Sequence, residues 1–151
     1  MADTSLSEKK LGLLIWQVSN YWQSKLRKVI KGYNISLNEY LIIETIYKLG
    51  PYRKVLSQIN IAKNACLDVS VVSINLTLLE NKNLILRSQL DKRTKNILLT
   101  EQGKTLIISL LKYISDEEIN FFNKLANDTF NFTNSLKLLL GKKIRIKAKN
   151  L

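Results

Sequence analysis

Residues 56–103 read LSQINIAKNACLDVSVVSINLTLLENKNLILRSQLDKRTKNILLTEQG and contain two helix starts in close succession. Ser57 and Asp68 are residue types that cap helix N-termini, because their side-chain oxygens accept free backbone amides. Ser57 is followed by apolar residues at helical spacing over 59–62, and Asp68 by a longer series. About four residues separate the two predicted helices, which is the spacing of a helix-turn-helix.

The helix that Asp68 begins is expected to bury one face. Its buried stripe is predicted to consist of Val69, Val72, Leu76 and Leu79. Asn83 is suited to end the helix, because asparagine tolerates the left-handed backbone of a helix terminator. The helix is therefore predicted to cover about residues 69–82.

The pattern changes after this helix. Residues 85–90 alternate in part between apolar and polar, and residues 97–99 form a second apolar run. The polar, turn-forming segment 91–96 lies between them, which predicts a β-hairpin with a charged tip. With further helices on both sides, the predicted fold class is mostly α with a small β-hairpin wing. This is the element order of a winged helix-turn-helix protein.

A long helix and a shorter one are predicted before this segment. Apolar residues occur at helical spacing from Leu11 to Ile30, at positions 11, 14, 15, 18, 22, 26, 29 and 30, and Gly32 is expected to end the helix. This apolar surface fits either a partner subunit or the core of the same chain. A capping box at residues 36–39 begins the next helix, which residues 50–51 stop.

The C-terminal third is also predicted to be helical. Thr100 is expected to cap a long helix, and a second capping box at residues 115–118 predicts a kink or a restart. A last helix is expected from about Thr129 to Leu140, ended by Gly141. The segment 142–149 is strongly basic, and we interpret it as a phosphate contact rather than a merely solvated tail.

Composition narrows the function. The chain has 151 residues, and its 24 Lys and Arg against 12 Asp and Glu give a net charge of +12, which favours a polyanionic partner. It contains no histidine, and Cys66 is its one cysteine, so a zinc site, a disulfide framework and most nucleophilic catalysis are disfavoured. We expect a non-enzyme without metal or cofactor, and we interpret Cys66 as a small buried thiol.

A membrane or secreted location is not expected. The apolar run after Lys9 and Lys10 is soon interrupted by polar residues, and no small-residue cleavage site follows it. No apolar stretch approaches the roughly 20 residues of a membrane span. We therefore expect a soluble, cytoplasmic protein with no membrane partner.

Several residues in this stretch resemble the motif of the MarR family of bacterial transcriptional regulators. The matching positions are Ile61-Ala62, Asp68, Leu79-Glu80, Asn83-Leu84, Arg87, Asp91-Lys92-Arg93 and Leu99-Thr100-Glu101-Gln102-Gly103. They lie in register without a gap, and the order of elements extends the resemblance over nearly the whole chain. An Asp-x-Arg motif alone has little specificity, whereas several matches at the right spacing are far more specific.

The resemblance implies a homodimer that binds pseudo-palindromic double-stranded DNA, with one half-site per subunit. On this reading residues 1–151 form a single domain, with dimerisation helices at 9–32 and 101–140, a DNA-binding lobe at 36–100 and a basic tail at 141–151. Ligands, where relatives have them, lie between the dimer base and the DNA-binding lobe. The sequence identifies no effector.

The wing is expected to contact DNA through Lys92, Arg93 and Lys95. The resemblance places Arg93 in the minor groove, and a narrow A·T-rich minor groove attracts arginine because it concentrates negative potential. Asp91 is expected to hold the wing by pairing with a basic residue. A solvated hairpin turn without function is the alternative.

The helix at 69–82 is the predicted recognition helix. The residues expected to face the major groove are Ser70, Val71, Ser73, Ile74, Asn75 and Thr77. Within this helix no Lys or Arg occurs before Lys82, so the helix lacks an arginine that could read guanine. The Ser, Asn and Thr side chains can hydrogen-bond to bases. Val71 and Ile74 suit contact with thymine methyl groups. We predict an A·T-rich site, and the resemblance implies repression by exclusion of polymerase.

Two other functions stay open. Val71, Ile74 and Leu78 form an outward apolar patch, which suits a protein partner and would leave only weak, nonspecific nucleic-acid binding. A general DNA or RNA binder would use the basic charge without site preference. An Arg93→Ala variant is predicted to separate these functions, because only the first depends on this side chain for specificity.

Overall fold

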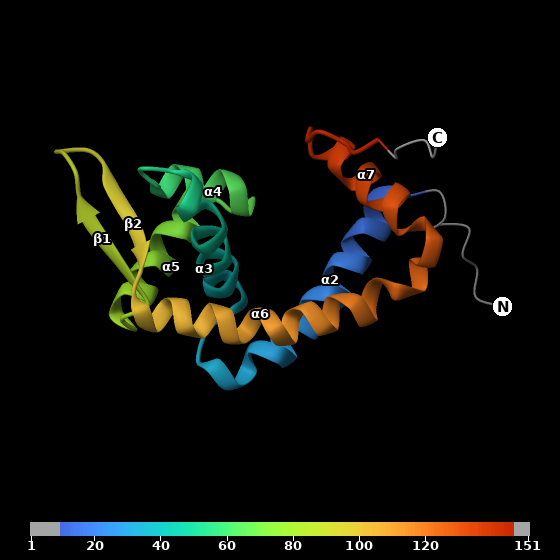
Figure 1. The fold of residues 1–151 in the computed structure, drawn as a ribbon, viewed down its shortest axis with the longest axis horizontal. Helices are drawn as coiled ribbons and strands as arrows, with labels where there is room; N and C mark the ends of the chain where they lie inside the picture. Colours follow the sequence, from blue (N-terminus) through green and yellow to red (C-terminus); the bar gives the residue numbers. More distant parts are fainter. Residues whose placement is uncertain (1–9, 147–151) are drawn as a thin grey trace, which may run out of the picture. The chain divides into compact units, whose positions relative to one another are not determined.

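The computed structural model describes residues 10–146 as a mostly helical chain with one hairpin (Figure 1). The helices and strands are α2 (Leu11–Ile30), η1 (Lys31–Tyr33), α3 (Leu37–Leu49), η2 (Gly50–Tyr52), α4 (Gln58–Ala65), α5 (Val69–Asn81), β1 (Ile85–Gln89), β2 (Lys95–Leu99), α6 (Glu101–Phe122), η3 (Asn123–Asp128) and α7 (Thr129–Leu139). Residues 1–9 and the end of the basic tail, residues 147–151, lie outside the described residues. The described residues pack as two compact units that divide after Ile114, and the single domain stays a prediction.

The first unit has its core between α3, α4 and α5, which contact one another. Its fully buried side chains include Ile42, Ile43, Ile61, Val72, Leu76, Leu79, Ile85, Ile97, Ile107 and Leu110. Each such isoleucine or leucine contributes about 1.5–3 kcal/mol relative to an exposed side chain. The stripe predicted for α5 is confirmed at three of its positions. Val69 is the exception and is exposed.

Capping residues begin these helices as the sequence predicts. The Ser36 hydroxyl accepts the Glu39 amide and the Glu39 carboxylate accepts the Ser36 amide, which completes the capping box of α3. Ser57 caps α4 through an equivalent exchange with Asn60. Asp68 occupies the N-cap position of α5 but makes no side-chain capping hydrogen bond, so its predicted role is wrong.

In the first unit, left-handed residues follow three of the helices. Asn83 has φ 59° after α5, which confirms the predicted terminator. Gly32 was expected to end α2, but the chain continues through the turn η1, and Asn34 with φ 55° makes the reversal. Cys66 with φ 54° closes α4, three residues before α5 begins. Asparagine tolerates this backbone through local polar contacts, whereas for cysteine it is unusual.

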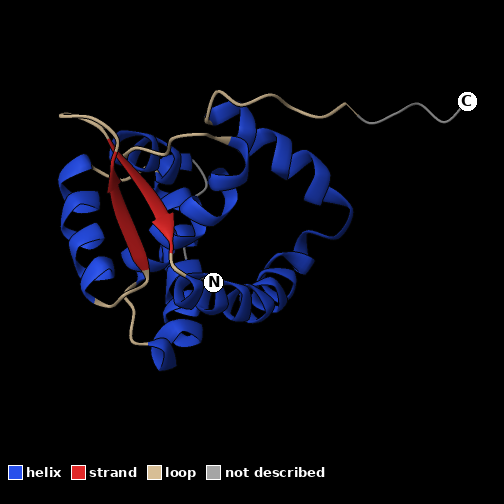
Figure 2. Ribbon diagram, turned by 60° about the vertical axis from the view of Figure 1, so that its left-hand side comes forward, coloured by secondary structure: helices blue, strands red, loops and turns tan. Residues whose placement is uncertain are grey.

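The wing is an antiparallel pair in which Ile85 faces Leu99 and Gln89 faces Lys95 (Figure 2). The segment before α4 joins its edge, because the Ile97 amide donates to the Leu56 carbonyl at 2.9 Å. The Asn96 side chain accepts the Leu56 amide, also at 2.9 Å. These bonds hold β2, the strand that follows the wing tip, against the helix-turn-helix.

The helix after the wing starts where the sequence predicts. The Thr100 hydroxyl accepts the Gly103 amide at 2.9 Å and donates to the Asn83 carbonyl at 2.7 Å. The predicted kink at residues 115–118 is wrong, because α6 continues to Phe122. A capping box forms only where its first residue leaves the helical backbone. The irregular residue comes later, at Ala126 with φ 45° and ψ −119°.

The second unit consists of the end of α6, η3 and α7. Phe122 contacts the rings of Phe121 and Phe132. Gly141 has φ 68° and ends the last helix, as predicted. Among the described residues from Ser115 onward, none is fully buried. The apolar side chains of this unit are therefore left with uncovered surface.

Candidate nucleic-acid interface

The recognition helix α5 presents an apolar outer face. Ile74 is 64% exposed and Leu78 is 43% exposed, while Ser70 and Thr77 are also exposed. Val71 and Ser73 are half-buried at the edges of this face. No Lys or Arg occurs between Val69 and Asn81, so the helix brings hydroxyl and branched apolar groups to the surface without a positive charge.

Two of the α5 side chains predicted to contact DNA form hydrogen bonds within the protein. Asn75 is only 8% exposed, and its amide donates to the Val71 carbonyl at 2.8 Å, so its predicted outward position is wrong. An asparagine four residues after a carbonyl on the same helix can satisfy that carbonyl and turn inward. The Thr77 hydroxyl donates to the Ser73 carbonyl at 3.3 Å and accepts from Arg87 at 3.4 Å. What Thr77 leaves for a partner is mainly its methyl group.

The tip of the wing carries three exposed cations. Lys92, Arg93 and Lys95 are all exposed, and Lys92 and Arg93 enter none of the ion pairs among the described residues. Asp91 was expected to pair with a basic side chain. Instead its carboxylate accepts the backbone amides of Arg93 and Thr94, each at 2.7 Å.

This arrangement has two consequences for the wing tip. The two backbone amides lower the pKa of Asp91 below its ordinary value, although partial desolvation opposes them. The carboxylate is used to shape the turn, so the guanidinium of Arg93 is left pointing into solvent rather than neutralised.

Arg87 connects the wing to the recognition helix. Its Nε and Nη2 atoms donate to the two carboxylate oxygens of Glu80, both at 3.1 Å. The hydrogen bonds from Arg87 lower the pKa of Glu80, and the same bonds raise the pKa of Arg87. The sequence shows both residues as positions of the family motif but does not reveal this contact. Its only signal is a pair of opposite charges on either side of the turn between α5 and β1.

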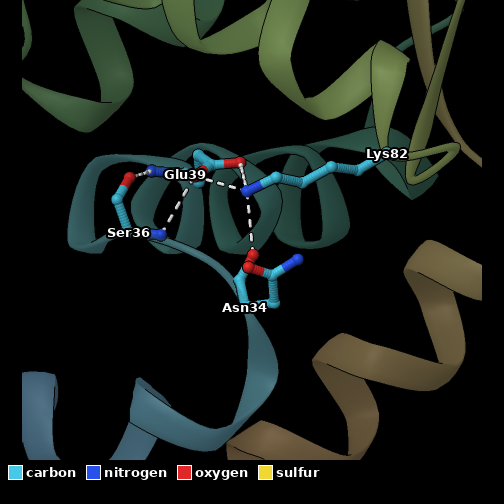
Figure 3. Close-up of polar contacts among 4 residues, drawn as sticks. All are labelled: Asn34, Ser36, Glu39 and Lys82. Carbon is cyan, nitrogen blue, oxygen red and sulfur yellow. Dashed lines mark hydrogen bonds and ion pairs between the residues drawn. The ribbon is translucent and has the colours of Figure 1, made fainter.

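Lys82, the first cation after the recognition helix, is turned inward (Figure 3). Its ammonium lies 2.9 and 3.0 Å from the two carboxylate oxygens of Glu39 and 2.8 Å from the Asn34 carbonyl. Glu39 is 3% exposed, so this is a largely buried ion pair between α3 and the end of α5. Sequence reasoning identified Glu39 only as part of a capping box.

Cys66 lies in the turn between α4 and α5. The prediction of a buried thiol is wrong, because the residue is exposed. The residue is the left-handed C-cap of α4 and therefore lies in the turn, beyond the helical residues whose spacing sets the buried face. Its thiol lies 3.9 Å from the Lys63 carbonyl, within the distance of a weak sulfur hydrogen bond.

Each unit also has an uncovered apolar surface. In the first unit the N-terminal part of α2 exposes large apolar side chains, among them Leu11, Ile15, Trp16, Val18 and Tyr21. In the second unit an open trough of about 620 Å³ is lined by Ile119, Phe122, Leu125, Phe132, Leu136 and Leu140 together with a few polar side chains. Surfaces of this kind mark sites of protein contact.

The start of the basic tail is ordered against α7. The Asn134 amide donates to the Arg145 carbonyl at 2.8 Å, and its oxygen accepts the Arg145 amide at 3.0 Å. These bonds hold the first part of the tail, with its basic residues exposed, while residues 147–151 lie outside the described residues. Whether the tail contacts phosphate stays a prediction.

Other kinds of site find little support among the described residues. No cluster of His, Cys, Asp and Glu there could hold a metal ion. No single described helix is long and apolar enough to cross a membrane; α4 and α5 pass that test only as a pair bent by 113°.

Comparison with known proteins finds transcriptional regulators among the relatives in sequence and in fold. The chain matches no protein-family model. It is 26% identical over 131 residues to YdcH of Bacillus subtilis, described as an uncharacterized HTH-type transcriptional regulator, covering 85% of this chain and 88% of that protein.

Two solved structures share the architecture. The Staphylococcus aureus MepR–DNA complex has a TM-score of 0.79 at 24% identity, covering 87% of this chain and 96% of MepR. A MarR-family regulator from Rhodococcus sp. RHA1 has a TM-score of 0.77 at 18% identity, covering 91% and 99%. The predicted mostly helical winged fold of the MarR type is thereby confirmed. YdcH, MepR and the Rhodococcus protein are each described as a transcriptional regulator.

Proposed function

We propose that this chain, a winged helix-turn-helix protein of the MarR type, is a sequence-specific DNA-binding regulator of transcription. It acts as a homodimer in the cytoplasm and represses by occupying a promoter. Support comes from the likeness to a regulator solved with DNA and from the excess of positive charge. The observation that carries the proposal is the wing tip, where exposed cations lie on a hairpin that is hydrogen-bonded to the helix-turn-helix.

DNA recognition is divided between two elements. The recognition helix α5 enters the major groove and offers Ser70, Ile74 and the methyl of Thr77 to base edges, with Val71 and Ser73 at the margin. Branched apolar groups contact thymine methyls, so the half-site is A·T-rich. Arg93 enters the adjacent minor groove, where an A·T-rich sequence narrows the groove and strengthens its negative potential. Lys92 and Lys95 neutralise phosphates.

Dimerisation covers the apolar surfaces of the two units. The exposed apolar side chains at the start of α2 and those lining the trough of the second unit are otherwise open to water. About 25 cal/mol is gained for each Å² of apolar area that a partner buries. The partner is a second copy of this chain, and the pair of recognition helices then reads a pseudo-palindrome.

Selection from a random duplex library at about physiological salt tests this function. An enriched palindrome with A·T-rich half-sites supports a dimeric regulator with sequence preference. Enriched G·C-rich half-sites would contradict the proposed reading by apolar contacts. Uniform weak binding that disappears with added salt would show that the charge acts without site preference.

A second candidate function is a winged-helix protein-interaction module. The exposure of Ile74 and Leu78 favours it, because an apolar patch on a helix suits a protein surface. In that case the library selection yields no enriched site. Replacing Arg93 would then change DNA binding little, while replacing Ile74 would remove the protein contact.

A further inference from the structure

The ammonium of Lys82 has no hydrogen left for DNA. A lysine ammonium offers three N–H donors. Three oxygen atoms lie within 3.0 Å of Nζ, two from the Glu39 carboxylate and one from the Asn34 carbonyl. Although Lys82 is the first basic residue after the recognition helix, its charge is therefore directed into the protein (Figure 3).

The Glu39 carboxylate requires this partner. Its side chain is 4% exposed, and besides Lys82 it accepts the Ser36 amide at 3.0 Å. Removing one member of a buried ion pair leaves the other charged and without compensation, which is strongly unfavourable. The lysine side chain, at 30% exposure, reaches the carboxylate from the rim of the core. The pair is thus a fixed feature of the fold rather than a mobile surface contact.

Lys82 is far along the chain from both of its partners. Lys82 directly follows α5, Glu39 lies in the first turn of α3, and Asn34 makes the left-handed turn between α2 and α3. The bond to the Asn34 carbonyl spans 48 positions and the bonds to Glu39 span 43. A single ammonium therefore joins the C-terminal end of the recognition helix to the point where α2 passes into α3.

We propose that Lys82 is a positioning residue that fixes the recognition helix to the α2–α3 junction and thereby sets the distance between the two half-sites that a dimer reads. This inference rests on the proposed function, because α2 is there a dimerisation helix. A recognition helix held at Asn34 moves with α2. The distance between the two recognition helices of a dimer therefore follows the way in which the dimerisation helices are arranged. DNA reading then depends on a cation that does not contact DNA.

The first test compares Lys82→Met with Lys63→Met. Lys63 is an exposed residue of α4, so its replacement removes the same charge without disturbing the pair. Both full-length variants are titrated with the palindrome selected by the wild-type protein and with versions whose half-sites are one base pair closer or farther apart. Each titration is repeated at several salt concentrations.

The expected results differ for the two variants. Lys82→Met is expected to bind the selected palindrome at least tenfold more weakly and to lose most of the wild-type preference for its spacing, with an unchanged salt slope. Lys63→Met is expected to keep the spacing preference. If Lys82→Met instead lowers the salt slope by about one and keeps the spacing preference, Lys82 contacts a phosphate and the inference is wrong.

A second measurement without DNA separates this inference from the proposed function. Amide hydrogen exchange is expected to accelerate in Lys82→Met both at residues 79–83 and at residues 33–36, and in Lys63→Met at neither. Acceleration at one segment alone, or at none, would overturn the positioning role whether or not the protein selects a DNA sequence. Where Lys82→Met does not fold, Glu39→Gln is used, since its amide keeps an acceptor, and the same two segments decide the outcome.

Discussion

The predicted recognition helix α5 and the wing expose opposite chemistry. α5 has no Lys or Arg from Val69 to Asn81, whereas three cations stand within the four positions from Lys92 to Lys95. The polar groups of α5 are partly used within the helix, as Asn75 and Thr77 show, while the side chain of Arg93 is exposed. The exposed cations and the exposed apolar groups of this lobe that the proposed function uses therefore belong to different elements.

Cations at the end of α5 reinforce this difference. Lys82 and Arg87 lie next to the recognition helix, yet each is paired with a carboxylate, Glu39 and Glu80 respectively. A count of basic residues near α5 would overstate the positive charge that this helix offers. The consequence for the proposed function is that the wing supplies the charge and the contact with the minor groove, while the helix supplies the contacts with the major groove. Variants can alter α5, the wing or the contacts between these two elements.

The largest effect, a loss of stability, is expected where α5 is joined to the wing. Replacing Gly103 with alanine places a Cβ 2.1 Å from the carbonyl oxygen of Leu84, the residue that joins α5 to β1. Since that oxygen also accepts the Thr100 amide, the backbone on both sides has to shift. Overpacking of this kind costs about 1–3 kcal/mol and at times more. Urea unfolding followed by tryptophan fluorescence measures the loss.

Gly32 provides the matched control for this substitution. A Cβ at Gly32 meets nothing within 4 Å, and the backbone there is not left-handed. Gly32→Ala is therefore expected to leave stability unchanged or to raise it by up to about 1 kcal/mol. Equal stability of Gly103→Ala and the wild type would show that the connection between helix and wing is not tightly packed.

Replacing Arg93 is expected to weaken DNA binding more than replacing Ile74. Arg93→Ala removes the exposed guanidinium proposed for the minor groove, and loss of a specific contact costs about 1–3 kcal/mol, or roughly fivefold to 150-fold in affinity. Fluorescence anisotropy with the selected palindrome measures it. Lys92→Ala is the control and is expected to weaken all duplexes to a similar, smaller extent. Equal losses on selected and random DNA for Arg93→Ala would contradict minor-groove reading.

Sequence reasoning predicted the fold well because the fold depends on local signals. Ser57, Asn83 and Thr100 act through contacts within a few residues or through their own backbone, and the spacing of apolar residues fixes which helix faces are buried. The exposed cations of the wing follow from the same local pattern. The resemblance to the family motif added the identity of the fold.

The errors concern contacts that no local pattern records. Asn75 turns inward because a carbonyl on its own helix takes its amide, and Cys66 is exposed because it lies in the left-handed turn after α4. The pairing of Lys82 with Glu39 joins residues 43 positions apart. Helical periodicity predicts the face on which a residue lies, but it does not predict the hydrogen-bond or ion-pair partner of its side chain.

Ile74 tests the helix side of the comparison. Ile74→Ala shortens the most exposed apolar side chain among the predicted α5 contacts and is expected to lower affinity for the selected palindrome about threefold to tenfold, near the lower end of the range for one base contact. Random DNA should be bound as before, because no charge changes. Unaltered binding of the selected site would favour the protein-interaction function. The measurement is a competition titration between the two duplexes.

The smallest effect is expected at the contact between the two elements, where Arg87 holds Glu80. Arg87→Met is expected to lower the free energy of unfolding at neutral pH by no more than about 1 kcal/mol, because Glu80 is 40% exposed and solvent screens the pair. Lys104→Met, which breaks an exposed ion pair with Glu101, is the control and should have no measurable effect. A larger loss in Arg87→Met would mean that the wing depends on this contact for its place.

The pH dependence of the same variant gives a sharper readout. Arg87 lowers the pKa of Glu80 in the folded protein, so the pair stabilises the fold at pH values above the unfolded pKa of glutamate, about 4.3. That contribution is lost as the pH falls from there through the lower folded pKa. In Arg87→Met the pKa of Glu80 should rise toward its ordinary value, and the difference in stability from the wild type should vanish in acid. Carbon-13 NMR of the Glu80 carboxyl group follows the titration, and an unchanged pKa would show that the contact does not persist in solution.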